Sequence, residues 1–398
     1  MPNRFQFNQS VLHSVVGGKS AIDMPALDIS TLKEANAFLK AYGFDVSVPD
    51  QMEKLWYFHR RAMVLLTEKL DFNIDEIPEI LRERKLLEDP RKLLLFASCS
   101  EENLARKTGG VVLGDNVAFD NLSMLQIQQL QRWSCVILRC CHVFVHAEND
   151  LFASFSEEIQ KQILSPFQNC IYHDGTSGTT YLRRADEVDQ HSPLALMGFE
   201  SKPFKTSTST VIKLLAKPNA LAMNVFDKLG VRFVTQSMFD TFRVVRFLVE
   251  ENLISYPHII PDQSSNNIYP VDLFLQACVD IIQLQQQDPL NPSSQWNEDQ
   301  VNEYFRQYLA QRENDAGFIR KENAFSGADY RFIKFIARKL VRVSLPGESV
   351  GFSFFYPFEV QIMDQESHAR ILSGPSHHQA YKDRQKIAAR KRLDPQTL

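Results

Sequence analysis

Residues 226–254 read FDKLGVRFVTQSMFDTFRVVRFLVEENLI, and this stretch decides the fold. Its β-branched and aromatic run predicts a buried strand over 231–235. Ser237 then begins a helix whose apolar residues recur at helical spacing. Two charged residues, Asp227 and Arg232, frame the strand. Because charges near a core need partners, they form either a structural ion pair or a site in which the carboxylate holds a hard cation and the guanidinium holds phosphate.

The composition indicates a folded globular protein of more than one domain. The chain has 398 residues, more than one small core needs, so two domains are expected. A net charge of −4 argues against an electrostatic nucleic-acid binder, and no DNA partner is expected. No apolar run is long enough to span a membrane, and the N-terminus is not a signal peptide. The six cysteines form no CxxC pair, so we expect reduced thiols in a cytoplasmic protein.

Helical signals dominate the first part of the chain. Residues 1–150 form a predicted helical region, in which Thr31 can cap one helix and 125–150 form a long helix that is apolar nearly all round in its second half. Strand and helix signals alternate over 151–398, the predicted second domain. This domain carries an inserted segment at 255–320 and a basic helix at its carboxyl end.

A group of lysines follows the first strong strand of the second domain. Lys202, Lys205 and Lys213 leave this strand and enter a helix that Ser207 can cap. Lysines and free backbone N–H groups at a helix start can bind phosphates. The plainer interpretation is a solvated helix N-terminus, because lysine is usually exposed.

Two carboxylates fall within predicted strands. One motif reads Asp227-x-x-Gly230-x-Arg232, and the other reads EVQI at 359–362, in an otherwise apolar and aromatic strand. A single acid in a strand is more often an edge or ion-pair residue. Two acids on neighbouring strands are the smallest ligand set that holds Mg²⁺ on a polyphosphate, so the pairing of Asp227 with Glu359 is the informative feature.

Taken in order, these motifs resemble the synthetase domain of the RelA/SpoT family over residues 195–385. That family also carries an H…G…H-x-x-Y-K pattern, which fits here without a gap at His368, Gly374, His378, Tyr381 and Lys382. Family members transfer pyrophosphate from ATP to the 3′-hydroxyl of GDP or GTP. The resemblance implies an α+β domain with a mixed, nucleotidyltransferase-like sheet flanked by helices, behind a helical N-terminal region.

The resemblance also implies roles for individual residues. Asp227 and Glu359 would be catalytic and would hold Mg²⁺, with Glu359 near the attacking hydroxyl. The family's acceptor segment, K-x-N-G-Y-x-S-(I/L)-H, aligns in two ways, either on residues 321–326 or on Tyr330 and Lys334. The nucleotide-binding residues that the resemblance implies are Lys202, Lys205, Ser207, Lys213, Arg232, Tyr330, Lys334, Gln361, His378, Tyr381 and Lys382.

Three functions remain open at this point. The first is synthesis of an alarmone from ATP and a nucleotide. The second is transfer of pyrophosphate or a nucleotide to an RNA end, guided by the basic tail at 382–392. The third is a decayed site that only binds nucleotide or a partner. The plainer interpretation of the tail is a solubilising, partly frayed terminus.

The helical N-terminal region is not expected to be an alarmone hydrolase. It lacks a convincing set of His and Asp metal ligands at family-like spacing. The dipeptide His173-Asp174 resembles a histidine–aspartate metal motif, but it lies beside two glycines and therefore indicates a turn.

Overall fold

The structure, a computed structural model, divides into two compact units. We call Met1–Asp150, Thr206–Asn224 and Asp383–Leu398 the helical unit, and Leu151–Lys205 with Val225–Lys382 the sheet unit. No helix in the part of the chain described is long and apolar enough to cross a membrane. The residues described are 14–17, 20–23, 27–98, 123–148, 154–184, 193–204, 207–217, 225–286, 296–312, 317–318, 331–344, 351–373 and 378–394.

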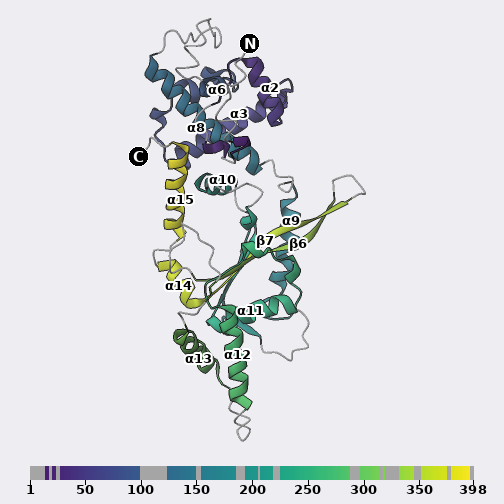
Figure 1. The fold of residues 1–398 in the computed structure, drawn as a ribbon. Helices are drawn as coiled ribbons and strands as arrows, with labels where there is room; N and C mark the ends of the chain where they lie inside the picture. The colour runs from purple at the N-terminus through teal and green to yellow at the C-terminus, as the bar shows by residue number, and fades with distance from the viewer. Residues whose placement is uncertain are drawn as a thin grey trace. The chain divides into compact units, whose positions relative to one another are not determined.

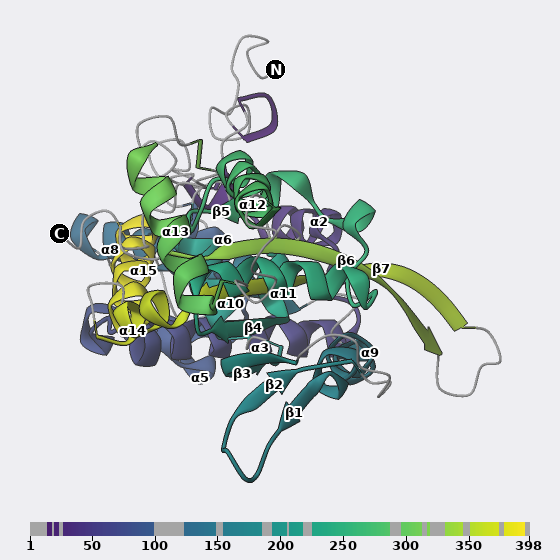
Figure 2. The ribbon, with the colours of Figure 1, turned by 90° about the horizontal axis from the view of Figure 1, so that it is seen from below.

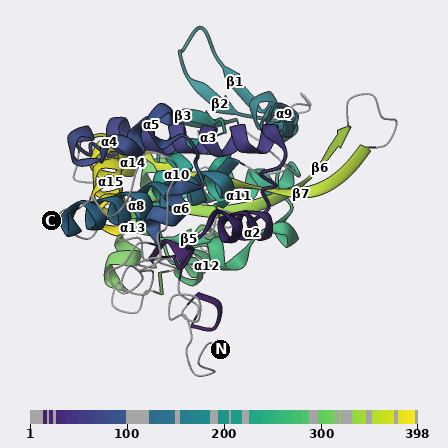
Figure 3. The same cartoon turned by 90° about the horizontal axis from the view of Figure 1, so that it is seen from above.

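The long helix α8, Met124–Glu148, is central to the helical unit (Figure 3). Its middle, residues 133–137, is continuously buried, with Trp133 and Ile137 fully enclosed. In the second half, which the sequence predicts to be buried, Cys140, Val143 and Phe144 are buried and most of their neighbours are only half-buried. Three helices pack against it, namely α3 (Pro49–Val64), α6 (Lys92–Ala97) and α10 (Ser207–Ala216).

A local sequence signal explains the start of one further helix in this unit, but not the boundaries of the short helices. Thr31 and Glu34 form a reciprocal capping box at the start of α2 (Leu32–Tyr42). The sequence from 77 to 87 predicts one short helix, but the structure has two, because Glu83 between them has an extended backbone. These are α4 (Glu79–Arg82) and α5 (Arg84–Leu87), and α3 continues as a π-helical turn, Leu65–Lys69.

A seven-stranded mixed sheet forms the centre of the sheet unit, with strand order β1-β2-β3-β4-β7-β6-β5. Figure 1 shows its two long strands, β6 and β7, side by side. Strands β4 and β7 are parallel, and the other neighbours are antiparallel. The sheet and its flanking helices confirm the predicted α+β class and are consistent with a nucleotidyltransferase-like arrangement. The strands are β1 (Ile171–His173), β2 (Thr180–Leu182), β3 (Leu194–Lys202), β4 (Gly230–Thr235), β5 (Ser265–Asn266), β6 (Ile333–Ser344) and β7 (Gly351–Asp364).

The two faces of this sheet differ in chemistry. Val231 and Phe233 alternate with Arg232 along β4, so they point to the opposite face. On that apolar face, Phe167 of α9 (Ser156–Asn169) packs against Phe233, and α11 (Met238–Glu250) contributes to the same core. Figure 2 shows both helices beside the sheet. Because side chains alternate between the two faces, Arg232, Glu359 and Gln361 lie together on the other face of β4 and β7.

The described parts of the segment at 255–320 contribute to the core of the sheet unit. Its short strand β5 pairs with β6, and Tyr269 and Phe305 are completely buried in the same cluster as the sheet residues. The sequence predicts helices over 271–287 and 301–313, and the structure has α12 (Val271–Gln286) and α13 (Glu298–Gln311) there. No sequence pattern predicted α14 (Gln365–Ser373) or the hairpin of β1 and β2. The turn of this hairpin contains Asp174.

Two segments that the sequence assigns to the second domain belong to the helical unit. One is α10, and the other is most of α15 (His378–Leu393). Helix α15 buries Gln385, Ala389 and Leu393, which are spaced four residues apart and therefore share one face. The basic tail up to residue 394 is therefore a packed helix and not a frayed terminus.

Candidate functional site

The site is built where β4 and β7 lie closest. Their parallel register pairs Gly230 with Glu359, and β3 places Lys202 opposite Gly230 on the other side. A side-chain carbon added to Gly230 would lie 2.4 Å from the Glu359 carbonyl oxygen, which is too short for any contact of real atoms. The glycine of the D-x-x-G-x-R motif is therefore required by the close approach of the two strands.

The carboxylate of Glu359 is buried and paired. Lys202 Nζ lies 2.9 Å from Glu359 Oε1 and also donates to Gln361 Oε1 at 2.9 Å. The Glu359 side chain is 11% exposed and that of Lys202 is 24% exposed. Such a buried charge is tolerated because an opposite charge lies beside it. In sequence alone, Glu359 has no cationic neighbour, so only the fold reveals this partner.

A second row of polar side chains lies two residues farther along the strands. Arg232 donates through Nε to Gln361 Oε1 at 3.0 Å and pairs through NH1 with Glu200 at 3.0 Å. Strand register extends the row to Lys334 of β6, which is opposite Gln361. The ion pair of Arg232 is thus made with Glu200. Glu200 was not among the predicted site residues. It lies two residues before Lys202 on a predicted strand, and this spacing places both side chains on one face.

Asp227 lies just before β4, in a 3₁₀ turn, Phe226–Lys228, that packs against β7. The side chain is half-buried, and the turn is joined to β7 by a hydrogen bond from the Glu359 N–H to the Leu229 carbonyl at 2.9 Å. This arrangement brings the two motifs that carry the predicted acids to one end of β4. That the two carboxylates share one ion stays a prediction.

Two predicted nucleotide-binding residues, Ser207 and Lys213, lie on α10 and therefore in the helical unit. Within that unit, Arg61 donates to the Ser207 hydroxyl at 2.6 Å and pairs with Glu148 at 2.9 Å. The hydroxyl that the sequence analysis assigned to phosphate thus interacts with a guanidinium from α3. No sequence signal indicated this role for Arg61.

The rest of the predicted set is only partly described. Tyr381 and Lys382 lie in the first turns of α15, where Tyr381 is half-buried and Lys382 exposed. His378 begins that helix, but its side chain lies outside the described part. Lys205, Gly374 and Tyr330 also lie outside the described residues, as does the whole alternative acceptor segment at 321–326.

The basic tail is anchored to the helical unit. Arg392 is 9% exposed, pairs with Asp23 at 2.6 Å, and donates to the Leu214 carbonyl of α10 at 3.0 Å. Arg390 donates to the Asp71 carbonyl at 2.9 Å and stacks over Phe72. These contacts engage two of the three arginines and lysines at the end of the tail, and they leave Lys391 exposed.

The residues present fit a magnesium ion held together with a substrate. Among the described residues, no group of three or more His, Cys, Asp or Glu side chains could hold a metal by itself. Mg²⁺, however, is commonly held through one or two carboxylates with waters and substrate phosphates as its remaining ligands. The turn that carries Asp227 packs on the strand that carries Glu359, so the backbone brings the two predicted ligands to one end of β4. Their joint binding of an ion stays a prediction.

Comparisons with known proteins carry no argument about function. No protein-family model matches the chain, and no curated protein does so either. Among solved structures, the chain is similar to a GTP pyrophosphokinase family protein from Streptococcus pneumoniae. The match has 16% sequence identity, covers 61% of this chain and 86% of that one, and has a TM-score of 0.26. The function is therefore argued from the site itself.

Proposed function

We propose that the polar face of the sheet binds the triphosphate of ATP and transfers its pyrophosphoryl group to a nucleotide hydroxyl. The observation that carries the proposal is the parallel register of β4 and β7, which pairs Gly230 with Glu359 and Arg232 with Gln361. Two motifs that are far apart in the chain thereby form one patch. This is the pair of motifs on which the resemblance to RelA/SpoT synthetases rests.

The cations of this patch supply the electrostatic part of the mechanism. Phosphoryl transfer depends mainly on positioning and on neutralising charge on the transferred group. Lys202 and Arg232 lie on adjacent strands and share Gln361 as a hydrogen-bond partner, so one polyphosphate can meet both. Asp227 and Glu359 would hold Mg²⁺, which when bound would neutralise charge on the phosphates.

Glu359 has a second role as the acceptor of a proton. Its carboxylate is compensated by Lys202 at 2.9 Å. A phosphate that draws the Lys202 ammonium to itself leaves this carboxylate beside the acceptor, where it can take the hydroxyl proton. The hydroxyl oxygen then bonds to the β-phosphorus of ATP, the bond from that phosphorus to the α-phosphate oxygen breaks, and AMP leaves.

The packing of the tail favours a small nucleotide over RNA as the acceptor. The RNA hypothesis assigned residues 382–392 to the phosphate backbone of the acceptor. Arg390 and Arg392 instead hold backbone carbonyls and Asp23 within the helical unit, so they stabilise the fold. We therefore propose a nucleotide 3′-hydroxyl as the acceptor and Lys202, Arg232 and Gln361 as the donor-binding residues.

The test is to incubate the full-length protein with MgCl₂, ATP labelled in its terminal phosphates, and GDP, GTP or a short RNA. We expect AMP and a labelled nucleotide product with GDP or GTP. Glu359→Gln should lower the rate about a hundredfold or more, as removal of a proton acceptor does. Glu250→Gln, the same change at an exposed position of α11, is the matched control.

Two results would overturn the proposal. Absence of AMP release with every acceptor, under conditions in which ATP binds, would indicate a site that only binds nucleotide. Transfer to RNA alone would restore the RNA hypothesis.

A further inference from the structure

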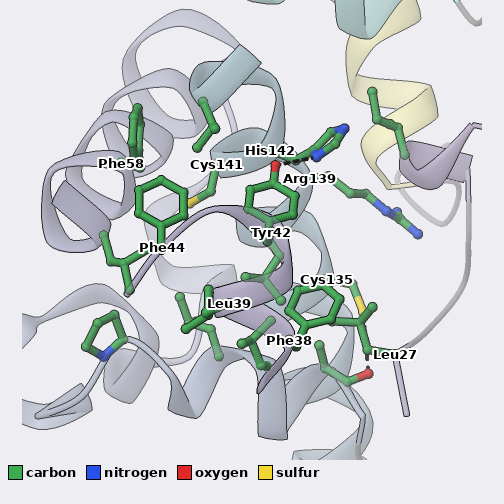
Figure 4. Close-up of a pocket in the computed structure, with 18 residues that line it drawn as sticks. Leu27, Phe38, Leu39, Tyr42, Phe44, Phe58, Cys135, Arg139, Cys141 and His142 are labelled. Atoms are coloured by element: carbon green, nitrogen blue, oxygen red, sulfur yellow. Dashed lines mark hydrogen bonds between the residues drawn. The ribbon is translucent and has the colours of Figure 1, made fainter. Parts of the chain in front are cut away.

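The helical unit contains a cavity of about 340 Å³ between α2, α3, α6 and α8 (Figure 4). Its wall is almost entirely apolar, and four aromatic rings, those of Phe38, Tyr42, Phe44 and Phe58, come from two of these helices and the residues after α2. All of the residues that line it belong to the helical unit. The cavity is therefore separate from the polar face of the sheet and is not explained by the proposed function.

The size of this space matches that of a ligand site. Small-molecule pockets are typically about 300–1,000 Å³, are mainly apolar, and carry a few placed polar groups. Protein interiors are otherwise packed to high density, and the wall of an apolar void lacks partner atoms for dispersion contacts. An apolar occupant would supply these contacts.

Few polar groups interrupt the apolar wall, and most are neutral at pH 7. The Tyr42 hydroxyl and His142 Nδ1 lie 2.6 Å apart and satisfy each other, as Figure 4 shows. Burial, with a smaller contribution from His146, lowers the pKa of His142 to about 4. Burial also raises the pKa of the Cys135 thiol to about 11 and that of Cys141 to about 12, so neither is ionised.

Arg139 is the charged residue of this lining. Figure 4 shows its chain extending along the edge of the cavity, with the guanidinium directed away from the aromatic rings. There it donates through NH1 to the Leu393 carbonyl at the end of α15, at 2.7 Å. A guanidinium has five N–H donors in a planar fork, a geometry that suits a carboxylate.

We propose that this cavity binds a small apolar carboxylate, with its hydrocarbon part among the aromatic rings and its carboxylate at Arg139. The apolar wall selects the hydrocarbon, and the single cation at the edge selects one negative charge. A neutral alcohol of the same length would fill the same space but could not form an ion pair with the guanidinium.

The test is calorimetric titration of the full-length protein with decanoate and, separately, with 1-decanol. We expect saturable binding of decanoate, at least tenfold tighter than that of 1-decanol, and a melting temperature that rises with decanoate concentration. Arg139→Gln should remove the tenfold preference and leave binding of 1-decanol unchanged.

A filling variant tests whether the ligand is inside the cavity. Ala97 is completely buried in its wall, so Ala97→Leu should weaken decanoate binding at least tenfold. Ala37→Leu makes the same change on the exposed side of α2 and should bind as the unaltered protein does. If Ala97→Leu fails to fold, as circular dichroism would show, Cys141→Met adds volume from another wall.

Three outcomes would overturn the proposal. The first is the lack of saturable decanoate binding by the unaltered protein. The second is unchanged binding in a folded filling variant, which would place decanoate elsewhere. The third is equal affinity for 1-decanol and decanoate, which would identify a neutral occupant.

Discussion

The sheet unit and the helical unit bury polar groups in different ways. In the sheet unit, five polar side chains from three strands form one continuous network through Lys202, Glu359, Gln361, Arg232 and Glu200. In the cavity of the helical unit, the few polar groups form no such network: Tyr42 pairs with His142, and Arg139 donates to the Leu393 carbonyl at the edge of an apolar wall.

The difference follows from the geometry of the elements. Strand register places residues from distant parts of the chain in rows about 5 Å apart, so polar side chains of one row can meet. Helices pack through larger and less regular side-chain layers, which leave room for a cavity. The sheet unit can therefore assemble a charged site, whereas the helical unit offers an apolar one.

The largest effect is expected where the two central strands meet. In Gly230→Ala, the new methyl group would overlap the Glu359 carbonyl at 2.4 Å, so β4 and β7 must separate. We expect a loss of at least about 3 kcal/mol in the free energy of unfolding, because the obstacle is backbone and cannot rotate away. Urea unfolding followed by circular dichroism measures it.

Gly198→Ala in β3 is the control for this comparison. Its added carbon would lie 3.8 Å from Val234, an ordinary contact, so stability should change by less than about 1 kcal/mol. Equal effects of the two substitutions would contradict the close approach of β4 and β7.

The next effect concerns the charge pair of the network. Lys202→Met leaves the Glu359 carboxylate buried without its ammonium partner. Because Lys202 is partly exposed, we expect a cost of about 2.5 kcal/mol, below that of breaking a fully buried pair. The double variant Lys202→Met/Glu359→Gln should recover part of this loss in urea unfolding, and no recovery would mean that the two charges are not coupled.

In the helical unit, the corresponding test is to measure the free energy of unfolding as a function of pH. Burial lowers the pKa of His142 from 6.5 to about 4, so the unfolded chain binds this proton more readily than the fold does. The neutral His142 side chain therefore makes its full contribution to the free energy of unfolding above about pH 6.5, and this contribution is lost as the pH falls toward 4. Because His142 is partly exposed, we expect the loss to be about 2 kcal/mol. In His142→Gln, the free energy of unfolding should depend less on pH between about 4 and 6.5 than in the unaltered protein. The same change at exposed His173 should leave the pH dependence as it is.

The smallest expected effect is at the end of α15. Arg392→Ala removes the ion pair with Asp23 and the hydrogen bonds to α10 carbonyls, and should cost about 1.5 kcal/mol. Lys391→Ala, one residue earlier and exposed, should cost almost nothing. Hydrogen exchange of α15 measures both, and similar protection in the two variants would contradict the anchoring role of Arg392.

Structural features that depend on residues close together in the chain were predicted from the sequence. The sequence predicted the Thr31 cap of α2, the Ser237 cap of α11 and the strand after Gly230, because their partners lie within one turn or one run of the chain. The long buried helix α8 was predicted for the same reason, from apolar residues that recur along its own length.

The elements that the sequence missed are short or weakly patterned. Strands β1 and β2 have three residues each, too few for alternation to show, and β5 has two. Likewise, the split of the helix at 77–87 depends on one extended residue, Glu83, for which no local breaker is present.

By itself, the sequence determined that Asp227, Gly230 and Arg232 frame one strand and that Glu359 and Gln361 lie on another. Only the tertiary structure decided that these strands are parallel neighbours, that Glu200 joins Arg232, and that α10 belongs with the helical unit. The physical reason is range. Propensity and capping depend on neighbours along the chain, whereas register and domain membership depend on contacts between residues that the sequence places far apart.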